Sequence, residues 1–439
     1  MPAKLQLVST WNRDPLPATD QASLAYLVLD IAGEDASSQS QGSQPESEDS
    51  KFHTQNPLNL SLVLDTSGSM AGAKLQNLKQ AVRWVIDHLD PDDRIGITLF
   101  DDEVHPLAPS TQVSEAGDLL ERVDAIREAG GTAMSKGLLV GLDEARKGAA
   151  ARSDGGVVSR IIVLTDGQTW GDADRCKELA REAGAAGIPI TALGVGAEED
   201  WSIELLDALA SESGGVLDYI ARPEDISSAF EETVRAMQQV AAHNLRLTVE
   251  PSRGVAVRAV YRVTPMISRL WPAPGSPEEG TTEGRNSPLT LPLGDVQPDA
   301  GQTLLYEVLL PPRRPGQYKL ARFSLSYEAT GHAESEVALD LAAAFTPGGQ
   351  PGPGNPRVMN IVEKATTFKL QTRALEASML GDMANATRNL RAAATRLLNM
   401  GEADLAEAAE QEARALESGG RMSSAGTKKL AFDTRRLAP

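Results

Sequence analysis

The sequence predicts an α/β domain with a doubly wound, mostly parallel sheet, inserted into an antiparallel β-sandwich and followed by a C-terminal α-helical region. Three observations predict this fold class. Apolar strand-like runs alternate with amphipathic helical patterns over residues 58–240, an order typical of a parallel sheet covered on both faces. Segments with strand-like alternation precede and follow that region. Helical periodicity dominates from residue 357 onward.

Length, cysteine content and apolar patterning limit the class of protein. A chain of 439 residues is long for one hydrophobic core and predicts two or three domains. The single cysteine, Cys176, excludes an internal disulfide framework and favours a reducing compartment. The N-terminus lacks an apolar signal core, and no run approaches the ~18 apolar residues that span a membrane. We therefore expect a cytoplasmic protein that does not insert into a membrane.

The charge of the chain is strongly acidic and unevenly distributed. A formal net charge of −19 argues against nucleic-acid binding, which needs clustered Lys and Arg against phosphates. Residues 58–240 carry 16 basic and 32 acidic side chains, whereas residues 357–439 carry 13 basic and 10 acidic ones. This asymmetry indicates either a solvated acidic surface with a basic tail, or a tail that docks on an acidic face of this chain or of a partner.

The α/β domain is predicted over residues 58–242. Five short, β-branched runs bounded by turn residues predict its strands: LNLSLVLD, RIGITLF, RIIVLTDG, PITALGVG and GVLDYI. Apolar residues three and four positions apart predict a helix over 74–89 that buries one face. Further helices are predicted near 112–128, 135–146, 173–186, 202–211 and 224–240.

The flanking segments predict one β-sandwich. KLQLVST and SLAYLVLDI lie within residues 1–33, before the α/β domain. Six alternating segments lie within residues 243–345, namely NLRLTVEPS, VAVRAVYRV, PLTLPLGDV, TLLYEVLLPP, YKLARFSLSYEA and SEVALDLAAAF. Because an isolated strand pair is barely stable in water, a single interrupted sandwich is favoured over two independent β pieces.

Two stretches separate the predicted domains, and a helical region ends the chain. Residues 34–57, rich in Ser, Gln and Glu, predict a disordered linker. Residues 346–356 combine Pro and Gly and continue neither a strand nor a helix. Residues 357–439 predict two amphipathic helices broken at Gly401, followed by the basic tail. These helices form either a small bundle or an exposed hairpin for a partner helix.

The stretch LVLDTSGSM, residues 62–70, joins a strand to a helix through polar residues. Taken alone, Asp65, Ser67 and Ser69 are the residues of an ordinary capping turn around Gly68. In a parallel sheet, however, ligands bind outside the carboxyl ends of the strands, where the loops converge. Asp65 lies at such an end, so its role depends on which residues the other loops bring to the same edge.

Two further residues are expected at that edge. Asp166 ends another strand in IIVLTDG, and Thr132 lies in the glycine-paired loop AGGTAMS before a helix. Together with the residues of the first loop they form an all-oxygen set, without Cys or His. Such a set suits a hard cation such as Mg²⁺ or Mn²⁺ rather than zinc.

These positions resemble the metal-ion-dependent adhesion site of the von Willebrand factor A domain family, which includes the integrin inserted domains. Asp65-x-Ser67-x-Ser69, Thr132 and Asp166 match the motif at all five positions. The resemblance implies a Rossmann-like fold with one antiparallel edge strand, which EVHPLAP at residues 103–109 fits. It also implies that the two serines and Thr132 contact Mg²⁺, Mn²⁺ or Ca²⁺ directly, while the two aspartates act through water or the serines.

The function that the resemblance implies is metal-dependent docking. A cation held mainly by neutral hydroxyls keeps much of its charge, so a Glu or Asp of a protein partner can complete its coordination. The flanking strands resemble those of bacterial proteins that join this domain to a sandwich, and the hybrid-domain arrangement of integrin β chains by architecture. Helix 224–240 is followed almost directly by a sandwich strand. This further suggests that ligand binding at the metal site moves the two domains relative to each other.

Three other functions remain open on the sequence. The chain is similar in its A domain to accessory subunits of AAA+ ATPase machines of the MoxR or magnesium-chelatase type. A metal-dependent hydrolase is disfavoured, because no GxxxxGK[ST] or HExxH motif occurs and the five histidines are scattered. A structural scaffold with a vestigial site is disfavoured by the matching ligand positions. We therefore expect a protein that is not an enzyme.

Overall fold

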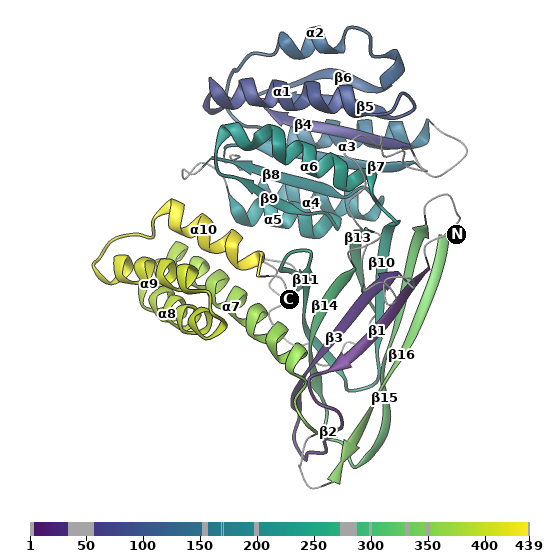
Figure 1. Ribbon diagram of the computed structural model, residues 1–439, viewed down its shortest axis with the longest axis vertical. Helices are drawn as coiled ribbons and strands as arrows, with labels where there is room; N and C mark the ends of the chain where they lie inside the picture. The colour runs from purple at the N-terminus through teal and green to yellow at the C-terminus, as the bar shows by residue number, and fades with distance from the viewer. Residues whose placement is uncertain are drawn as a thin grey trace, which may run out of the picture.

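The computed structural model describes residues 4–33, 57–151, 157–167, 169, 171–196, 202–272, 288–297, 301–329, 334–347 and 352–437. The predicted fold class is confirmed: an α/β domain, a β-sandwich and a helical region are all present (Figure 1). The predicted linker, except for Pro57, lies outside the described residues, as does the centre of the Pro/Gly stretch, residues 348–351.

The sheet of the α/β domain has six strands in the order β6-β5-β4-β7-β8-β9. Their bounds are β4 Leu58–Asp65, β5 Arg94–Phe100, β6 Val104–Gln112, β7 Val158–Thr165, β8 Ile190–Val195 and β9 Leu217–Ile220. Only the edge strand β6 is antiparallel, as EVHPLAP predicts. The central strands β4 and β7 are buried along their whole length, which explains their uninterrupted apolar and β-branched runs.

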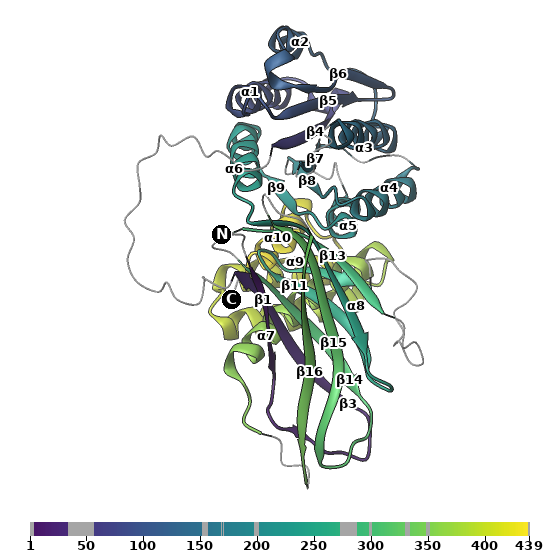
Figure 2. The same ribbon diagram turned by 90° about the vertical axis from the view of Figure 1, so that its right-hand side faces the viewer.

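Helices cover both faces of this sheet. Their bounds are α1 Ala73–His88, α2 Leu119–Asp124, α3 Met134–Ala150, α4 Ala173–Ala185, α5 Ile203–Ser213 and α6 Ile226–Gln238. Figure 2 shows α1 and α6 on one side of the sheet and α3, α4 and α5 on the other. The expected helix near 112–128 is much shorter, because Gln112 pairs with Arg94 in the sheet and only one α-helical segment, α2, follows.

The sandwich consists of two five-stranded sheets, β1-β3-β14-β11-β12 and β13-β10-β15-β16-β2. Its strands are β1 Leu5–Trp11, β2 Leu16–Pro17, β3 Ser23–Gly33, β10 Ala242–Pro251, β11 Ala256–Thr264, β12 Ser268–Trp271, β13 Leu289–Val296, β14 Gln302–Leu310, β15 Gly316–Ala329 and β16 Glu334–Thr346. Strand β3 pairs with β14, so the α/β domain is inserted into one continuous sandwich. The short strands β2 and β12 were not predicted, and β2 pairs with β16 in parallel.

Four helices form the C-terminal region: α7 Pro356–Met379, α8 Met383–Met400, α9 Ala403–Glu417 and α10 Ser424–Arg435. The predicted break at Gly401 is confirmed, because this glycine adopts φ +86° and ends α8. Helices α7 to α10 share one apolar core with the outer face of the β3 and β11 sheet, which favours a bundle over an exposed hairpin. No helix among the described residues is long and apolar enough to cross a membrane.

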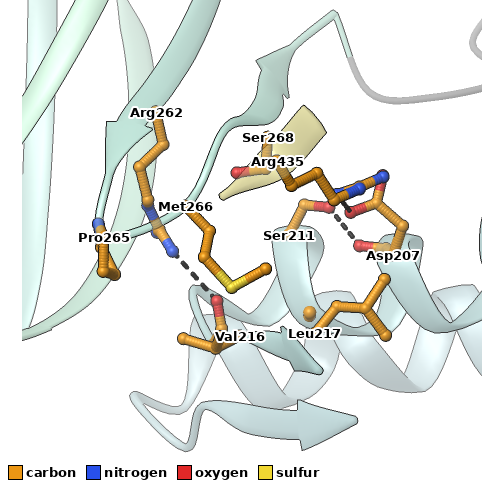
Figure 3. Close-up of a pocket in the computed structure, with 11 residues that line it drawn as sticks. Asp207, Ser211, Val216, Leu217, Arg262, Pro265, Met266, Ser268 and Arg435 are labelled. Atoms are coloured by element: carbon orange, nitrogen blue, oxygen red, sulfur yellow. Dashed lines mark hydrogen bonds and ion pairs between the residues drawn. The ribbon is translucent and has the colours of Figure 1, made fainter. Parts of the chain in front are cut away.

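The segment predicted as a basic tail is the helix α10, and it docks on the α/β domain. Arg435 forms an ion pair of 2.7 Å with Asp207 of α5, and both side chains are almost fully buried (Figure 3). Arg436 lies 2.7 Å from Asp218 of β9, and Phe432 packs on Tyr219 with ring centroids 5.1 Å apart. Of the alternatives for the tail, docking on an acidic face of this chain is therefore the observed one.

Buried charges also join the α/β domain directly to the sandwich. The Arg160 side chain, 2% exposed, pairs with Asp295 of β13. Arg262 of β11 donates hydrogen bonds of 3.0 Å to the carbonyl of Gly215 and 3.2 Å to that of Leu293. Arg160 lies near the start of β7, and Gly215 precedes β9. These contacts therefore lie toward the amino ends of the parallel strands, opposite the edge of the predicted metal site.

Candidate metal centre

The polar loops at the carboxyl edge of the sheet begin on two neighbouring strands. Asp65 is the last residue of β4, and Asp166 directly follows β7. These strands pair in parallel with Leu64 opposite Leu164, so their ends lie side by side. Because both strands are buried along their length, their backbones hold the two aspartates in fixed positions.

The hydroxyl groups of the first loop reach across to the second aspartate. Ser67 Oγ and Ser69 Oγ lie 3.1 Å apart, and Ser69 Oγ donates a hydrogen bond of 2.6 Å to Asp166 Oδ1. The backbone N–H of Ser67 donates to Asp65 Oδ1 at 2.8 Å, which fixes the turn. Four of the five predicted residues are thus joined by one hydrogen-bonded network.

The fifth predicted residue, Thr132, lies beside Gly167, close to the other four. A Cβ atom placed on this glycine would lie 3.1 Å from Thr132 Oγ1, 3.8 Å from Asp65 Oδ2 and 3.9 Å from Ser69 Oγ. The absence of a side chain at this position therefore leaves room beside oxygens of the first loop and of the Thr132 loop. The structure brings all five predicted side chains together at one edge.

Backbone contacts position the Thr132 loop over the first loop. The N–H of Ala129 donates to the carbonyl of Thr66 at 2.8 Å, and the N–H of Gly68 donates to the carbonyl of Gly130 at 3.2 Å. Gly130 adopts φ +61°, and a Cβ there would lie 2.7 Å from the Asp102 carboxylate. The paired glycines therefore let this loop lie close against the Asp102 carboxylate.

Asp172 ties the Thr132 loop to the Asp166 loop. Its Oδ2 accepts a hydrogen bond of 2.8 Å from the backbone N–H of Ser135, at the start of α3. Its Oδ1 bonds the hydroxyl of Thr169, whose oxygen also lies 3.1 Å from the carbonyl oxygen of Thr132. The sequence pattern does not reveal this role of Asp172, because an aspartate before a helix is typical of an ordinary cap.

Two further residues that sequence analysis missed contact the aspartates directly. Thr165 donates a hydrogen bond of 2.5 Å to Asp65 Oδ2. Lys74, in the first turn of α1, places Nζ 2.5 Å from Asp166 Oδ2. Thr165 could have been found as the last strand residue before Asp166, whereas no local pattern distinguishes Lys74 from a solvated helix lysine.

Burial makes the two carboxylates favourable partners for a cation. Asp65 and Asp166 are both fully buried, whereas Ser69 is exposed at the rim. Burial raises the pKa of Asp65 from 3.8 to about 6, although hydrogen bonds from Ser67 and Thr165 oppose that rise. A bound cation would offset the desolvation of this carboxylate.

The donor set fits a hard divalent cation. Among the described residues no three His, Cys, Asp or Glu side chains lie close enough to hold a metal ion. A cation at this edge would therefore depend on the hydroxyl oxygens of Ser67, Ser69 and Thr132 as well as on the carboxylates. Oxygen-only coordination of this kind is typical of Mg²⁺ and Ca²⁺.

Comparisons with known proteins agree with this architecture. Residues 59–234 match the family model of the von Willebrand factor type A domain, and residues 356–439 match that of the Sll0103-like, C-terminal alpha-helical domain. The uncharacterized protein sll0103 of Synechocystis sp. is 31% identical over 288 residues, which cover 65% of this chain and 64% of that protein. Human inter-alpha-trypsin inhibitor heavy chain H4 is 29% identical over 225 residues, which cover 45% of this chain and 24% of that protein.

A solved structure supports the fold over the whole chain. The von Willebrand factor type A protein from Catenulispora acidiphila superposes with a TM-score of 0.74 at 17% identity, covering 100% of this chain and 98% of that one. This chain spans less than two thirds of either curated relative, so the similarity describes domains rather than whole proteins. Residues 59–234 are a von Willebrand factor type A domain, combined in this chain with a C-terminal helical domain of the Sll0103-like type.

Proposed function

We propose that this chain is a metal-dependent docking protein, in which a divalent cation at the carboxyl edge of the sheet binds an acidic side chain of a protein partner. The residues that would hold the cation are Asp65, Ser67, Ser69, Thr132 and Asp166. A von Willebrand factor type A domain is a module of protein–protein interaction, which agrees with this proposal. The observation that carries it is the single network of buried carboxylates and hydroxyls at that edge.

The chain's own residues each have a separate task in this proposal. The cation supplies a concentrated positive charge at the rim. Asp65 and Asp166, buried and fixed by hydrogen bonds, balance part of that charge and orient the hydroxyls. Ser67, Ser69 and Thr132 offer neutral oxygens, which leave the cation able to attract a carboxylate. The exposed position of Ser69 leaves the outer side of the site open to a partner.

We also propose that the physiological cation is Mg²⁺, or else Mn²⁺ or Ca²⁺. Mg²⁺ fits the small all-oxygen set, and Mn²⁺ and Ca²⁺ have the same ligand preference. The acidity of the domain does not oppose an acidic partner, because a bound dication is the largest local charge in such a site.

Metal binding by the full chain tests the first half of the proposal. We expect Mn²⁺ to bind one site in calorimetry and Asp65→Asn to remove that binding. The matched control is Asp101→Asn. Asp101 is also a buried aspartate directly after a neighbouring strand, β5, but its Oδ1 accepts from the backbone N–H of Glu103 instead. Equal Mn²⁺ binding by wild type and Asp65→Asn would contradict the proposed site.

Capture of partners tests the second half. Immobilised full chain is incubated with native lysate in Mg²⁺ or in EDTA, and the Thr132→Ala variant is run beside it. Partners retained only by wild type in Mg²⁺ support the proposal, and an AAA+ ATPase among them would identify the accessory-subunit alternative. Partners retained equally in every arm would mean that this edge is not the docking surface.

The proposal extends to coupling between the site and the sandwich. Helix α6 ends at Gln238, and the sandwich strand β10 begins at Ala242, so a shift of α6 would be transmitted through three residues. We expect X-ray scattering profiles of the full chain to differ between Mg²⁺ with an acidic peptide and EDTA. Superimposable profiles would exclude the coupling while leaving the docking function intact.

A further inference from the structure

Lys74 occupies an unusual position for a lysine of a surface helix. It is the second residue of α1, yet its ammonium lies 2.5 Å from Oδ2 of Asp166, which is fully buried. The Lys74 side chain is only 21% exposed. Gly196, at the end of β8 with φ +96°, lies beneath it, since a Cβ there would sit 3.6 Å from Nζ. The ammonium thus reaches across the carboxyl edge of the sheet into the candidate metal centre.

This contact changes the charge balance of the centre. Asp166 accepts from Ser69 at Oδ1 and from Lys74 at Oδ2, so both of its oxygens have a partner within the chain. Two carboxylates and one ammonium give the centre a formal charge of −1. Without Lys74, the same centre would have a charge of −2 and would attract a dication more strongly.

We propose that Lys74 sets the affinity and the ligand preference of the metal centre, by lowering its affinity for the cation and raising the affinity of the loaded centre for an anionic ligand. The inference rests on the proposed function of the same site. A dication in a centre of charge −1 leaves a net charge of +1, which attracts a carboxylate. A dication in a centre of charge −2 leaves no net charge, and therefore no such attraction.

The geometry supports this role over that of a plain structural ion pair. In a buried structural pair both members are removed from water, and the strong attraction between them offsets that cost. Here only the carboxylate is fully buried, and the lysine side chain remains partly exposed. The flexible stem allows the ammonium to move toward solvent when a cation approaches Asp166, while its charge stays near the rim. Cation binding and anion binding would therefore be coupled through one side chain.

The test measures both affinities in full-length variants. Mn²⁺ binding is measured by electron paramagnetic resonance, and acetate binding to the Mn²⁺-loaded protein by the loss of water-proton relaxation. We expect Lys74→Met to bind Mn²⁺ tighter on the order of tenfold and acetate weaker by a similar factor. Lys74→Arg, which keeps the charge, should remain within about threefold of wild type for both.

A second lysine on the same rim offers a matched control. Lys136, in the first turn of α3, is exposed and donates to the backbone carbonyl of Asp102 rather than to either buried aspartate. Lys136→Met removes the same charge at the same edge and should leave the Mn²⁺ affinity close to that of wild type. Equal effects of both substitutions would reduce Lys74 to one of many surface charges and overturn the inference.

The outcomes separate this inference from the proposed function. If wild type binds no Mn²⁺, the proposed function fails. If wild type binds Mn²⁺ and Lys74→Met binds it with the same affinity, only the inference fails. Thermal melting without metal verifies that each variant is folded, and Lys74→Gln, which keeps a polar end group, replaces Lys74→Met if the latter melts below room temperature. The direction of change expected for Lys74→Gln is the same.

Discussion

At the scale of the residue, the candidate metal centre depends on hydroxyl groups that hold carboxylates in place. Thr165 is fully buried at the end of β7, and its hydroxyl donates to Asp65 Oδ2 at 2.5 Å. The same oxygen atom of Thr165 also accepts from the backbone N–H of Gly167 at 3.1 Å. Thr165 therefore orients Asp65 of the first loop and also fixes the backbone of the Asp166 loop at Gly167.

Replacing this hydroxyl by a methyl group tests its orienting role. We expect Thr165→Val to weaken Mn²⁺ binding by roughly tenfold or more, since groups that orient metal ligands typically contribute that much to affinity. Thr98→Val is the matched control, because Thr98 is buried on β5 of the same sheet and its hydroxyl has no hydrogen-bond partner among the described residues. Calorimetry on both variants measures the difference, and similar affinities would contradict the role of Thr165.

The residue scale also shows what sequence could predict about the site. Asp65, Ser67, Ser69, Thr132 and Asp166 lie at strand ends or in loops that a parallel sheet brings together, so their proximity follows from topology. That they bind a metal remains a prediction. Lys74 and Asp172 could not be predicted, because their roles depend on side chains that cross between loops, and a helix-start lysine or aspartate has many ordinary uses.

At the scale of the element, α3 is positioned by glycines that let it approach the sheet. A Cβ on Gly141 would lie 2.2 Å from Val63 Cγ2, and one on Gly148 would lie 2.1 Å from Asn59 Oδ1. Both contacts are with β4, the strand that ends in Asp65. Because α3 begins at Met134, its distance from the sheet also sets the position of the preceding Thr132 loop.

A single methyl group should therefore disturb both packing and site. We expect Gly141→Ala to lower the free energy of unfolding by about 1–3 kcal/mol, the range for overpacked cores. Gly117→Ala is the control, since a Cβ at Gly117 meets nothing within 4 Å. Chemical denaturation measures both, and an unchanged midpoint for Gly141→Ala would show that α3 shifts without loss of stability.

Elements were predicted best where an apolar run is buried on both faces and has clear limits. The strands β4 and β5 have the predicted bounds, because their apolar runs are closed by turn residues on both sides. The segment 112–128 was predicted as a helix from its apolar spacing, but pairing of Gln112 with Arg94 in the sheet overrides local propensity there. Helix α10 was missed because its buried face, including Phe432, is matched to other domains rather than to its own neighbours in sequence.

At the scale of the whole molecule, one residue of α10, Arg435, contacts all three domains. Arg435 pairs with Asp207 of the α/β domain, its guanidinium lies 5.0 Å from the ring centroid of Phe368 in α7, and its carbonyl accepts from the N–H of Ile267 in the sandwich at 2.9 Å. The cavity beside this pair has a volume of about 20 Å³, enough for a single water molecule. The three domains are therefore held by specific contacts rather than by linkers alone.

Breaking this pair should loosen the assembly. Arg435→Met leaves Asp207 buried without its partner, which typically costs about 3–5 kcal/mol. We expect a larger radius of gyration in X-ray scattering and faster proteolysis ahead of α10. Arg414→Met is the control, because Arg414 is largely exposed and pairs with Glu410 within α9. A compact profile for Arg435→Met would mean that the remaining contacts hold the domains.

The joint between the α/β domain and the sandwich should also respond to pH. Burial and the charge of Arg160 lower the pKa of His243 below 6.5, although Glu328 and Asp295 oppose the shift. The unfolded chain then takes up this proton before the folded one, so stability is present above pH 6.5 and is lost as pH falls from 6.5 toward the folded pKa. We expect the melting temperature to fall between about pH 7.5 and about pH 5.

The His243→Gln variant isolates this contribution. It should show a shallower decline of melting temperature over the same pH range, since Gln does not titrate. His88→Gln is the control, because His88 is exposed and stacks on Trp84 at 4.1 Å between ring centroids. If the melting temperatures of His243→Gln and wild type decline in parallel as the pH falls, other groups are responsible for the acid sensitivity.

The insertion of one domain into another has a consequence for biosynthesis. Strand β3 can pair with β1 early in synthesis, but its other edge stays unpaired until β14 has been made, since Leu29 pairs with Leu304. On the ribosome, the A domain can complete its own sheet while β1 and β3 still lack the remaining strands of the sandwich. Once folded, the inserted domain holds its two ends in place and shortens the loop that the sandwich must close. Any variant that slows folding of the A domain should therefore also leave nascent β1 and β3 exposed to chaperones or aggregation.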